Sequence, residues 1–159
     1  MLLAGILVSL LFSIFFSGIE VAFLSANKLQ IELLGKQGHI SGRILTFFKE
    51  KPTWFVGTAL VGNIASLLSF GVLTTQALVP VFHRLFPTFA GSVVLPFLVF
   101  TLILTLLVLY SVEFISKSFF IINSNKMILA LAIPFTIIAV CLFPIVFLII
   151  SLGKFFSSS

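Results

Sequence analysis

One carboxylate lies inside a long apolar stretch, and it is the first candidate for chemistry. Glu113 occurs within the run from Val93 to Ile122, which exceeds the roughly 20 residues that a bilayer-spanning helix needs. An ionised side chain at membrane depth costs about 3 kcal/mol or more unless it is paired, and such residues usually mark an ion or substrate pathway. The chain has only 4 acidic residues. We therefore place Glu113 at the centre of a predicted intramembrane polar site.

Two further polar residues are predicted to lie at the same depth. Ser17, Asn63 and Glu113 each lie ten residues from the polar end of their apolar segment, on the side that carries most of the Lys and Arg residues. At a rise of about 1.5 Å per helical residue, each side chain is roughly 15 Å from that surface. Three helices would thus present a hydroxyl, an amide and a carboxylate at one level.

This set of oxygen atoms is suited to a hard cation. Mg²⁺ keeps several waters and binds through one or two carboxylates together with neutral oxygens. The sequence has no cluster of His and Cys residues, which argues against zinc or copper. Gly18 follows Ser17 and Gly62 precedes Asn63. Helix breaks at these two points would free backbone carbonyls for an ion.

Each candidate residue also has a simpler interpretation. The Ser17 hydroxyl can donate to a carbonyl one turn earlier in its own helix. Asn63 can serve as an interhelical hydrogen-bonding residue. Glu113 can pair with Lys117 in the favourable i, i+4 order. Glu20 fits an anchor at the cytoplasmic end of its helix or a partner for a loop lysine better than an ion ligand.

The composition places the chain among integral membrane proteins. It is 60% hydrophobic and 8% charged over 159 residues, which leaves room for three or four spanning segments and no soluble catalytic domain. The net charge of +5 is explained by topology and lipid headgroups and does not require nucleic acid. His39 and His83 fall in loops predicted on opposite sides, and no Ser-His-Asp set is evident. We do not expect an enzyme.

Three spanning helices are predicted over residues 2–26, 53–79 and 92–122. The basic residues between the first two helices place that loop in the cytoplasm and the N-terminus outside. A signal peptide is the alternative for the first segment, but no Lys or Arg precedes its apolar run. Short interfacial helices are expected around a turn between Gly35 and Gly42. A short outside loop is expected over residues 80–91.

The last apolar stretch, residues 127–152, has two interpretations. It is long enough to cross the bilayer, and proline is tolerated in spanning helices, so hydropathy favours a fourth crossing. Pro134 and Pro144 nevertheless divide it into short pieces. A pair of short helices that dips into the membrane and returns is the alternative.

Four motifs together resemble the transmembrane domain of the cyclin M/CorC magnesium transporters. The resemblance covers nearly the whole chain, because the motifs occur in the family's order and spacing. They are Phe16–Ala22 (FSGIEVA), Gly42-Arg43 leading to Lys51-Pro52, Val61–Asn63 (VGN) and Val112–Lys117 (VEFISK).

The resemblance implies an all-α homodimer in a bacterial inner membrane or a plasma membrane. Each subunit would have three spanning helices, a juxtamembrane belt of short helices over residues 127–152, and a cytoplasmic C-terminus. The implied activity is sodium-coupled export of Mg²⁺, with Mg²⁺ as the transported ion and Na⁺ as the coupling ion. Ser17, Asn63 and Glu113 match the family's ion-binding positions.

The sequence departs from the family pattern at three points. Val112 and Ser116 replace the glycine and proline of the family's Gly-Glu-Ile-x-Pro-Lys motif, and Leu67 stands where a second asparagine is usual. The regulatory nucleotide-binding CBS domains that normally follow do not occur within the 159 residues. These departures support an alternative function, a non-transporting membrane anchor or assembly module that retains the fold.

Overall fold

The chain is helical throughout the part that its structure describes. A computed structural model describes residues 1–85 and 94–157, in which there are helices and no strands. This confirms the predicted all-α class. The helices are α1 (Leu2–Ser25), α2 (Lys28–Lys36), α3 (Ile40–Glu50), α4 (Pro52–Leu85), α5 (Val94–Ile122) and α6 (Ser124–Ser157).

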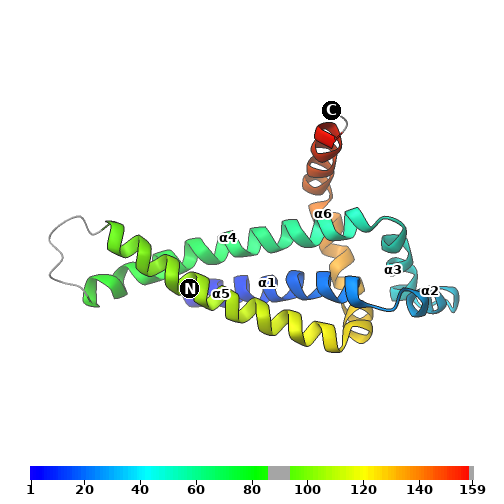
Figure 1. The fold of residues 1–159 in the computed structure, drawn as a ribbon, viewed down its shortest axis with the longest axis horizontal. Coiled ribbons are helices and arrows are strands. Elements are labelled where there is room, and N and C mark those ends of the chain that lie inside the picture. The colour runs from blue at the N-terminus through cyan, green and yellow to red at the C-terminus, as the bar shows by residue number, and fades with distance from the viewer. Residues whose placement is uncertain (86–93, 158–159) are drawn as a thin grey trace.

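Three long helices, α1, α4 and α5, run along the long axis of the molecule (Figure 1). The chain passes along α1, returns along α4 and runs along α5 in the direction of α1. All three helices, and also α6 as far as Gly153, are long and apolar enough to cross a membrane. The protein is therefore an integral, multi-pass membrane protein.

The predicted boundaries of α1 and α5 agree closely with the structure, whereas α4 is longer than expected. It continues to Leu85 and contains Pro80, so the first part of the predicted loop at 80–91 is helical. A proline inside a membrane helix is tolerated because neighbouring groups satisfy the freed backbone atoms. The rest of that predicted loop lies outside the described residues.

The last apolar stretch forms one helix and not two short ones. Both Pro134 and Pro144 lie inside α6. Figure 1 shows that α1, α4 and α5 run along the long axis of the molecule, whereas α6 runs across this axis. Its first half packs against the core through Ile128, Ala132 and Phe135, each at most 1% exposed.

An aromatic cluster joins four helices at one end of the molecule. Phe55 of α4 is at its centre, with ring centroids 3.9 Å from Phe23 of α1 and 4.3 Å from Phe135 of α6. Phe48 of α3 adds a third neighbour at 5.2 Å. Such pairs contribute about 0.5–1.5 kcal/mol each beyond the area they bury. The cluster fixes α6 and the α2–α3 hairpin against the ends of α1 and α4.

The predicted short helices α2 and α3 form a tight hairpin. A Cβ atom on Gly42 would lie 2.6 Å from the backbone nitrogen of Gly35, so the two helices touch backbone to backbone. Gly38 has a φ of +88° in the turn between them, a conformation that suits glycine. Asn27 caps α2 by accepting hydrogen bonds from the first backbone amides of that helix.

An ion cluster at Glu32 reinforces the hairpin. Lys49 Nζ of α3 donates to Glu32 Oε2 at 2.7 Å, and Lys36 Nζ lies 3.2 Å from Glu32 Oε1. The hydrogen bond from Lys49, followed by that from Lys36, holds the pKa of Glu32 below its ordinary value of 4.5. The charged form of Glu32 therefore stabilises the folded hairpin.

This cluster predicts a specific pH dependence for Glu32→Gln. Because the folded pKa is lowered, the contribution of Glu32 is present above the unfolded pKa and is lost as the pH falls through the folded pKa. The midpoint of thermal unfolding should be lower in the variant than in the wild type at neutral pH. The difference should disappear well below pH 4.5. Glu50→Gln is the control, since Glu50 forms no ion pair within the described residues, and a difference for Glu32→Gln that persists at low pH would contradict the assignment.

Candidate ion-binding site

A row of hydroxyl groups runs along the buried face of α1. Ser9, Ser13 and Ser17 are spaced four residues apart and are 7%, 1% and 2% exposed. Ser9 donates to the carbonyl of Gly5 at 2.8 Å, whereas Ser13 donates across the helix interface to Asn63 Oδ1 at 3.0 Å. The buried hydroxyl of Ser17 has no hydrogen-bond partner among the described residues. One polar group is thus left unsatisfied beside the contact between Ser13 and Asn63.

The contact between α1 and α4 depends on a missing side chain. A Cβ atom on Gly62 would lie 2.4 Å from the ring of Phe16, which is itself 3% exposed. Glycine at this position lets α4 approach α1 closely, as small residues commonly do between membrane helices. The close approach places the Asn63 amide within hydrogen-bonding distance of Ser13.

The contact between α1 and α5 is built in the same way. A Cβ atom on Gly18 would lie 2.5 Å from the ring of Phe120. Ser116 of α5 donates to the carbonyl of Ile14 at 3.0 Å. α1 therefore lies between α4 and α5, with a glycine and a hydroxyl at each interface.

These contacts set the relative depths of the predicted site residues. Asn63 is level with Ser13, and Ser116 is level with Ile14. Because α5 runs in the same direction as α1, Glu113 is level with residue 11 of α1. Ser17 is six residues further along, roughly 9 Å at a helical rise of 1.5 Å per residue. Asn63 and Glu113 thus lie near one level, and Ser17 lies closer to the end that carries α2 and α3.

Glu113 is on the flank of this arrangement and is paired. Lys117 Nζ donates to Glu113 Oε2 at 3.5 Å, and the two side chains are 48% and 30% exposed. The Lys117 ammonium also interacts electrostatically with the Glu20 carboxylate. No hydrogen bond within the described part of the chain joins Glu113 to Ser17 or Asn63. The structure thus shows the i, i+4 pair that the sequence offered as the alternative for Glu113.

The helix breaks predicted near the site do not occur. α1 is continuous through Ser17 and Gly18, and α4 is continuous through Gly62 and Asn63. The prediction was wrong because glycine here serves close helix packing and not unwinding. The backbone carbonyls stay within the helices, so the oxygens available to an ion are those of side chains.

A cavity of about 320 Å³ lies beside the α1–α4 contact. The hydroxyls of Ser9, Ser66 and Ser69 line it, together with the rings of Phe12 and Phe16. Ser66 and Ser69 each donate to a carbonyl one turn earlier in α4. The lining is mainly apolar, and Ser13, Ser17 and Asn63 are not part of it.

Sequence reasoning missed Ser13, which makes the contact expected of a site residue. Its signal was present, because Ser9, Ser13 and Ser17 recur at the spacing that places side chains on one face of a helix. Other buried hydroxyls also have no partner among the residues described: Thr74 of α4, and Thr101 and Thr105 of α5.

The ligand set excludes a dense cluster of charged or nitrogen ligands. Within residues 1–85 and 94–157, no group of three or more His, Cys, Asp or Glu side chains is placed to hold a metal ion. A cation between α1 and α4 would therefore be held mainly by hydroxyl and amide oxygens, with fewer than three carboxylates added. Such ligands are suited to a hard and partly hydrated ion.

Comparison with protein families places this arrangement in a known context. The family described as the cyclin M transmembrane N-terminal domain matches residues 4–158. The chain belongs to this family. Cyclin M domains are associated with divalent cation transport and form a transporter family, not an enzyme family. No curated protein matches the chain.

Within the cyclin M pattern, Ser116 has a structural role of its own. It stands at the position that the resemblance assigns to a proline, and its hydroxyl forms the interhelical hydrogen bond to Ile14. α5 is continuous through Glu113 and Ser116. A serine here leaves α5 undistorted, and its hydroxyl forms a hydrogen bond that attaches α5 to α1.

The glycine at the α1–α4 contact gives a direct test of this geometry. Gly62→Ala should destabilise the protein, because overpacking a filled interface typically costs about 1–3 kcal/mol and outweighs the gain of about 1 kcal/mol in helix propensity. Gly71→Ala in the same helix is the matched control, since a Cβ atom there meets nothing within 4 Å. Thermal unfolding should rank Gly62→Ala below both the wild type and Gly71→Ala. Equal midpoints for the two variants would contradict the contact.

Proposed function

We propose that this cyclin M domain binds Mg²⁺ between α1 and α4 and carries it across the membrane. Ser17 and Asn63 supply neutral oxygen ligands, and Glu113 supplies the charge. The observation that carries the proposal is the buried Ser17 hydroxyl, one helical turn from Ser13, which has no partner in the described structure. An unsatisfied buried hydroxyl costs about 1–3 kcal/mol. An ion or its hydration water would remove that cost.

The oxygen chemistry of the site fits a hydrated divalent cation. The Asn63 carbonyl oxygen accepts one hydrogen bond from Ser13 and has a second lone pair available. The same neutral oxygens suit Na⁺, which we propose as the coupling ion for Mg²⁺ export.

Lys117 has a defined role in this proposal. An unpaired carboxylate within the membrane is costly, and Lys117 neutralises Glu113 while the site is empty. When Mg²⁺ enters, it takes the place of the ammonium as the positive partner of Glu113. Because Glu113 and Asn63 lie near one level, only the Glu113 side chain has to reorient toward α1.

A second candidate function is a membrane anchor or assembly module without transport. The observation that favours it is the Glu113–Lys117 ion pair on a continuous α5. In this case Ser13, Asn63 and Ser116 serve only to hold the helices together. Transport requires the charge of Glu113 to bind Mg²⁺, whereas an anchor requires it only for the ion pair with Lys117.

Glu113→Gln separates the two candidates. If Glu113 binds the ion, loss of its charge should weaken Mg²⁺ binding by about tenfold or more, equivalent to about 1.4 kcal/mol. Lys117→Met added to this variant should not restore binding. Isothermal titration of Mg²⁺ into the purified protein measures both effects. Unchanged affinity in Glu113→Gln, with lowered stability that Lys117→Met restores, would instead support the anchor.

We propose a topology with the N-terminus outside, the α2–α3 hairpin in the cytoplasm and α6 as a belt along the membrane surface. The basic residues of the hairpin support its cytoplasmic side. The course of α6 across the other long helices supports the belt (Figure 1). The host membrane in this proposal is a bacterial inner membrane or a plasma membrane.

Accessibility of single cysteines tests this topology. In a Cys141→Ser background, an impermeant thiol reagent applied from outside should label Thr88→Cys and leave Ser41→Cys and Ser158→Cys unlabelled. Labelling of Ser41→Cys and Ser158→Cys should require opened membranes. Ser158→Cys labelled from outside would show that α6 crosses the bilayer as a fourth span.

We further propose that two copies associate within the membrane. Only 6% of the most apolar 18-residue stretch of α5 is buried within one chain. A Cβ atom on Gly71 of α4 would meet nothing within 4 Å. Gly57 is already used within the chain, since a Cβ atom there would contact Val146 of α6 at 3.4 Å. Mass measurement in detergent or nanodiscs should give twice the chain mass. A monomer at all concentrations would exclude the homodimer.

A further inference from the structure

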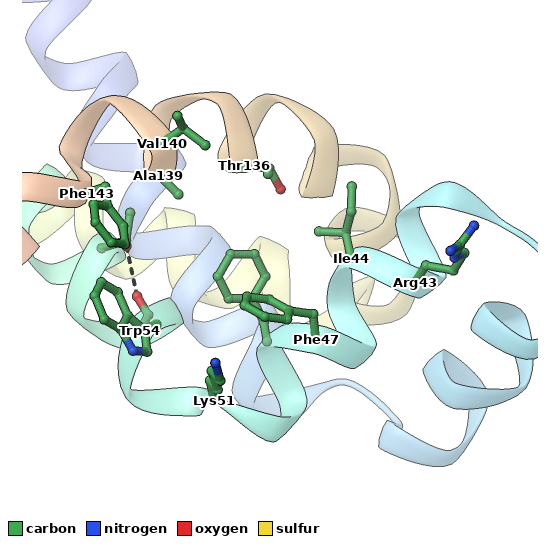
Figure 2. A pocket seen from close by; sticks show the side chains of 11 residues that line it. Arg43, Ile44, Phe47, Lys51, Trp54, Thr136, Ala139, Val140 and Phe143 are labelled. Atoms are coloured by element: carbon green, nitrogen blue, oxygen red, sulfur yellow. Dashed lines mark hydrogen bonds between the residues drawn. The ribbon is translucent and has the colours of Figure 1, made fainter. Parts of the chain in front are cut away.

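A separate groove of about 680 Å³ lies where α3, the start of α4 and the middle of α6 meet (Figure 2). Its volume is about twice that of the cavity of about 320 Å³ beside the α1–α4 contact. It does not include Ser17, Asn63 or Glu113. The proposed transport function therefore leaves this groove without a role.

The interior of the groove is apolar and open to the surroundings. Phe47 of α3 forms one wall, and Val140 and Phe143 of α6 form the other, each at least half exposed. Trp54 stacks on Phe143 with ring centroids 5.1 Å apart. A large exposed apolar surface on a membrane protein is suited to the hydrocarbon chains of lipids.

One edge of the groove carries positive charge and hydrogen-bond donors. Lys51 Nζ lies 5.2 Å from the centroid of the Phe47 ring and forms no ion pair with any described residue. Figure 2 shows the Lys51 ammonium and the indole nitrogen of Trp54 on the same side of the groove. No hydrogen bond of that indole N–H is found in the described part of the chain.

The N-terminus of α4 adds to this positive edge. α4 begins at Pro52, directly after Lys51, so the positive end of its dipole lies at this edge, although the Trp54 backbone amide already donates to the Lys51 carbonyl. Such helix termini favour anions such as phosphate. Arg43, at the far end of the groove in Figure 2, also forms no ion pair with a described residue. The nearby carboxylate of Glu50 is exposed and does not pair with Lys51.

The groove also lies at the level where lipid headgroups are expected. It is at the end of the bundle where α1 finishes at Ser25 and α4 starts at Pro52. Trp54 therefore occupies the interfacial position in which tryptophan is enriched. Basic residues next to spanning helices attract anionic lipids. The charge and the depth of the groove thus indicate the same class of ligand.

We propose that this groove binds one anionic glycerophospholipid. The phosphate lies against Lys51, the Trp54 indole N–H and the start of α4. An acyl chain lies between α3 and α6, in contact with Phe47 and Phe143. A bound lipid joins α3 to α6 and so stabilises the position of α6 relative to the bundle.

Trp54 provides its own reporter, because it is the only tryptophan in the chain. Phospholipids with brominated chains quench tryptophan fluorescence on contact. The protein is placed in bilayers that contain brominated phosphatidylglycerol or brominated phosphatidylcholine at the same mole fraction. Phosphatidylglycerol should compete for the site about fivefold more strongly, which corresponds to about 1 kcal/mol for one basic side chain near an anionic lipid.

Matched variants assign the effect to the groove. Lys51→Gln should remove most of the preference for phosphatidylglycerol, and Lys51→Arg should retain it. Lys28→Gln is the control for charge, since Lys28 begins α2 and does not line the groove; it should leave the preference unchanged. Val140→Phe, which narrows the groove, should weaken quenching by both lipids.

Three results would overturn the proposal. Equal quenching of the wild type by both lipids would indicate nonspecific contact with surrounding lipid. An unchanged preference in Lys51→Gln, with helical content preserved, would exclude the assigned phosphate site. Relief of quenching by inorganic phosphate as effectively as by unbrominated phosphatidylglycerol would show a site for free anions and not for a lipid.

Discussion

The structure depends on the requirement that polar atoms within an apolar membrane find partners inside the protein. Several hydroxyls of the long helices satisfy this requirement by donating to a carbonyl one turn earlier, as Ser9 and Ser66 do. Ser13 and Ser116 meet it across helix interfaces, and their hydrogen bonds attach α4 and α5 to α1. Ser17, one helical turn beyond Ser13, is buried and has no partner in the described structure. The hydroxyls of Thr74, Thr101 and Thr105 share this property, and Ser17 is the one on α1, the helix that also carries Ser13, which is the reason for proposing the ion there.

Close packing makes this arrangement rigid enough to act as a site. Gly18 and Gly62 admit the rings of Phe120 and Phe16, and any side chain at either glycine would collide with a ring. The aromatic cluster around Phe55 then fixes the other end of the helices. The side chain with the most freedom near the site is Glu113, which is partly exposed on the flank of α5. In the proposed function, the Glu113 side chain exchanges Lys117 for the ion by turning toward α1.

The sequence predicted the features that are governed by local rules. Bilayer thickness sets the length of apolar runs, so α1 and α5 were placed almost to the residue, and the i, i+4 spacing indicated the Glu113–Lys117 pair. Features that depend on contacts between helices were less accessible. The sequence shows that Ser13 shares a helix face with Ser9 and Ser17. Its contact with Asn63 cannot be predicted without knowing how α1 is aligned along α4. The course of α6 follows from packing of Phe135 and not from its prolines, and the groove at Lys51 exists only once α3 and α6 are brought together.

Mg²⁺ flux through Ser17→Ala tests the central claim most directly. The substitution removes a hydroxyl that has no partner in the described structure, so it should not lower the midpoint of thermal unfolding. If Ser17 is an ion ligand, proteoliposomes containing the variant should move Mg²⁺ about tenfold more slowly than the wild type, as expected for a loss of about 1.4 kcal/mol. Ser69→Ala is the control, because this exposed hydroxyl bonds only to its own helix. Wild-type liposomes with no flux above protein-free liposomes, or equal flux for Ser17→Ala and the wild type, would contradict the account.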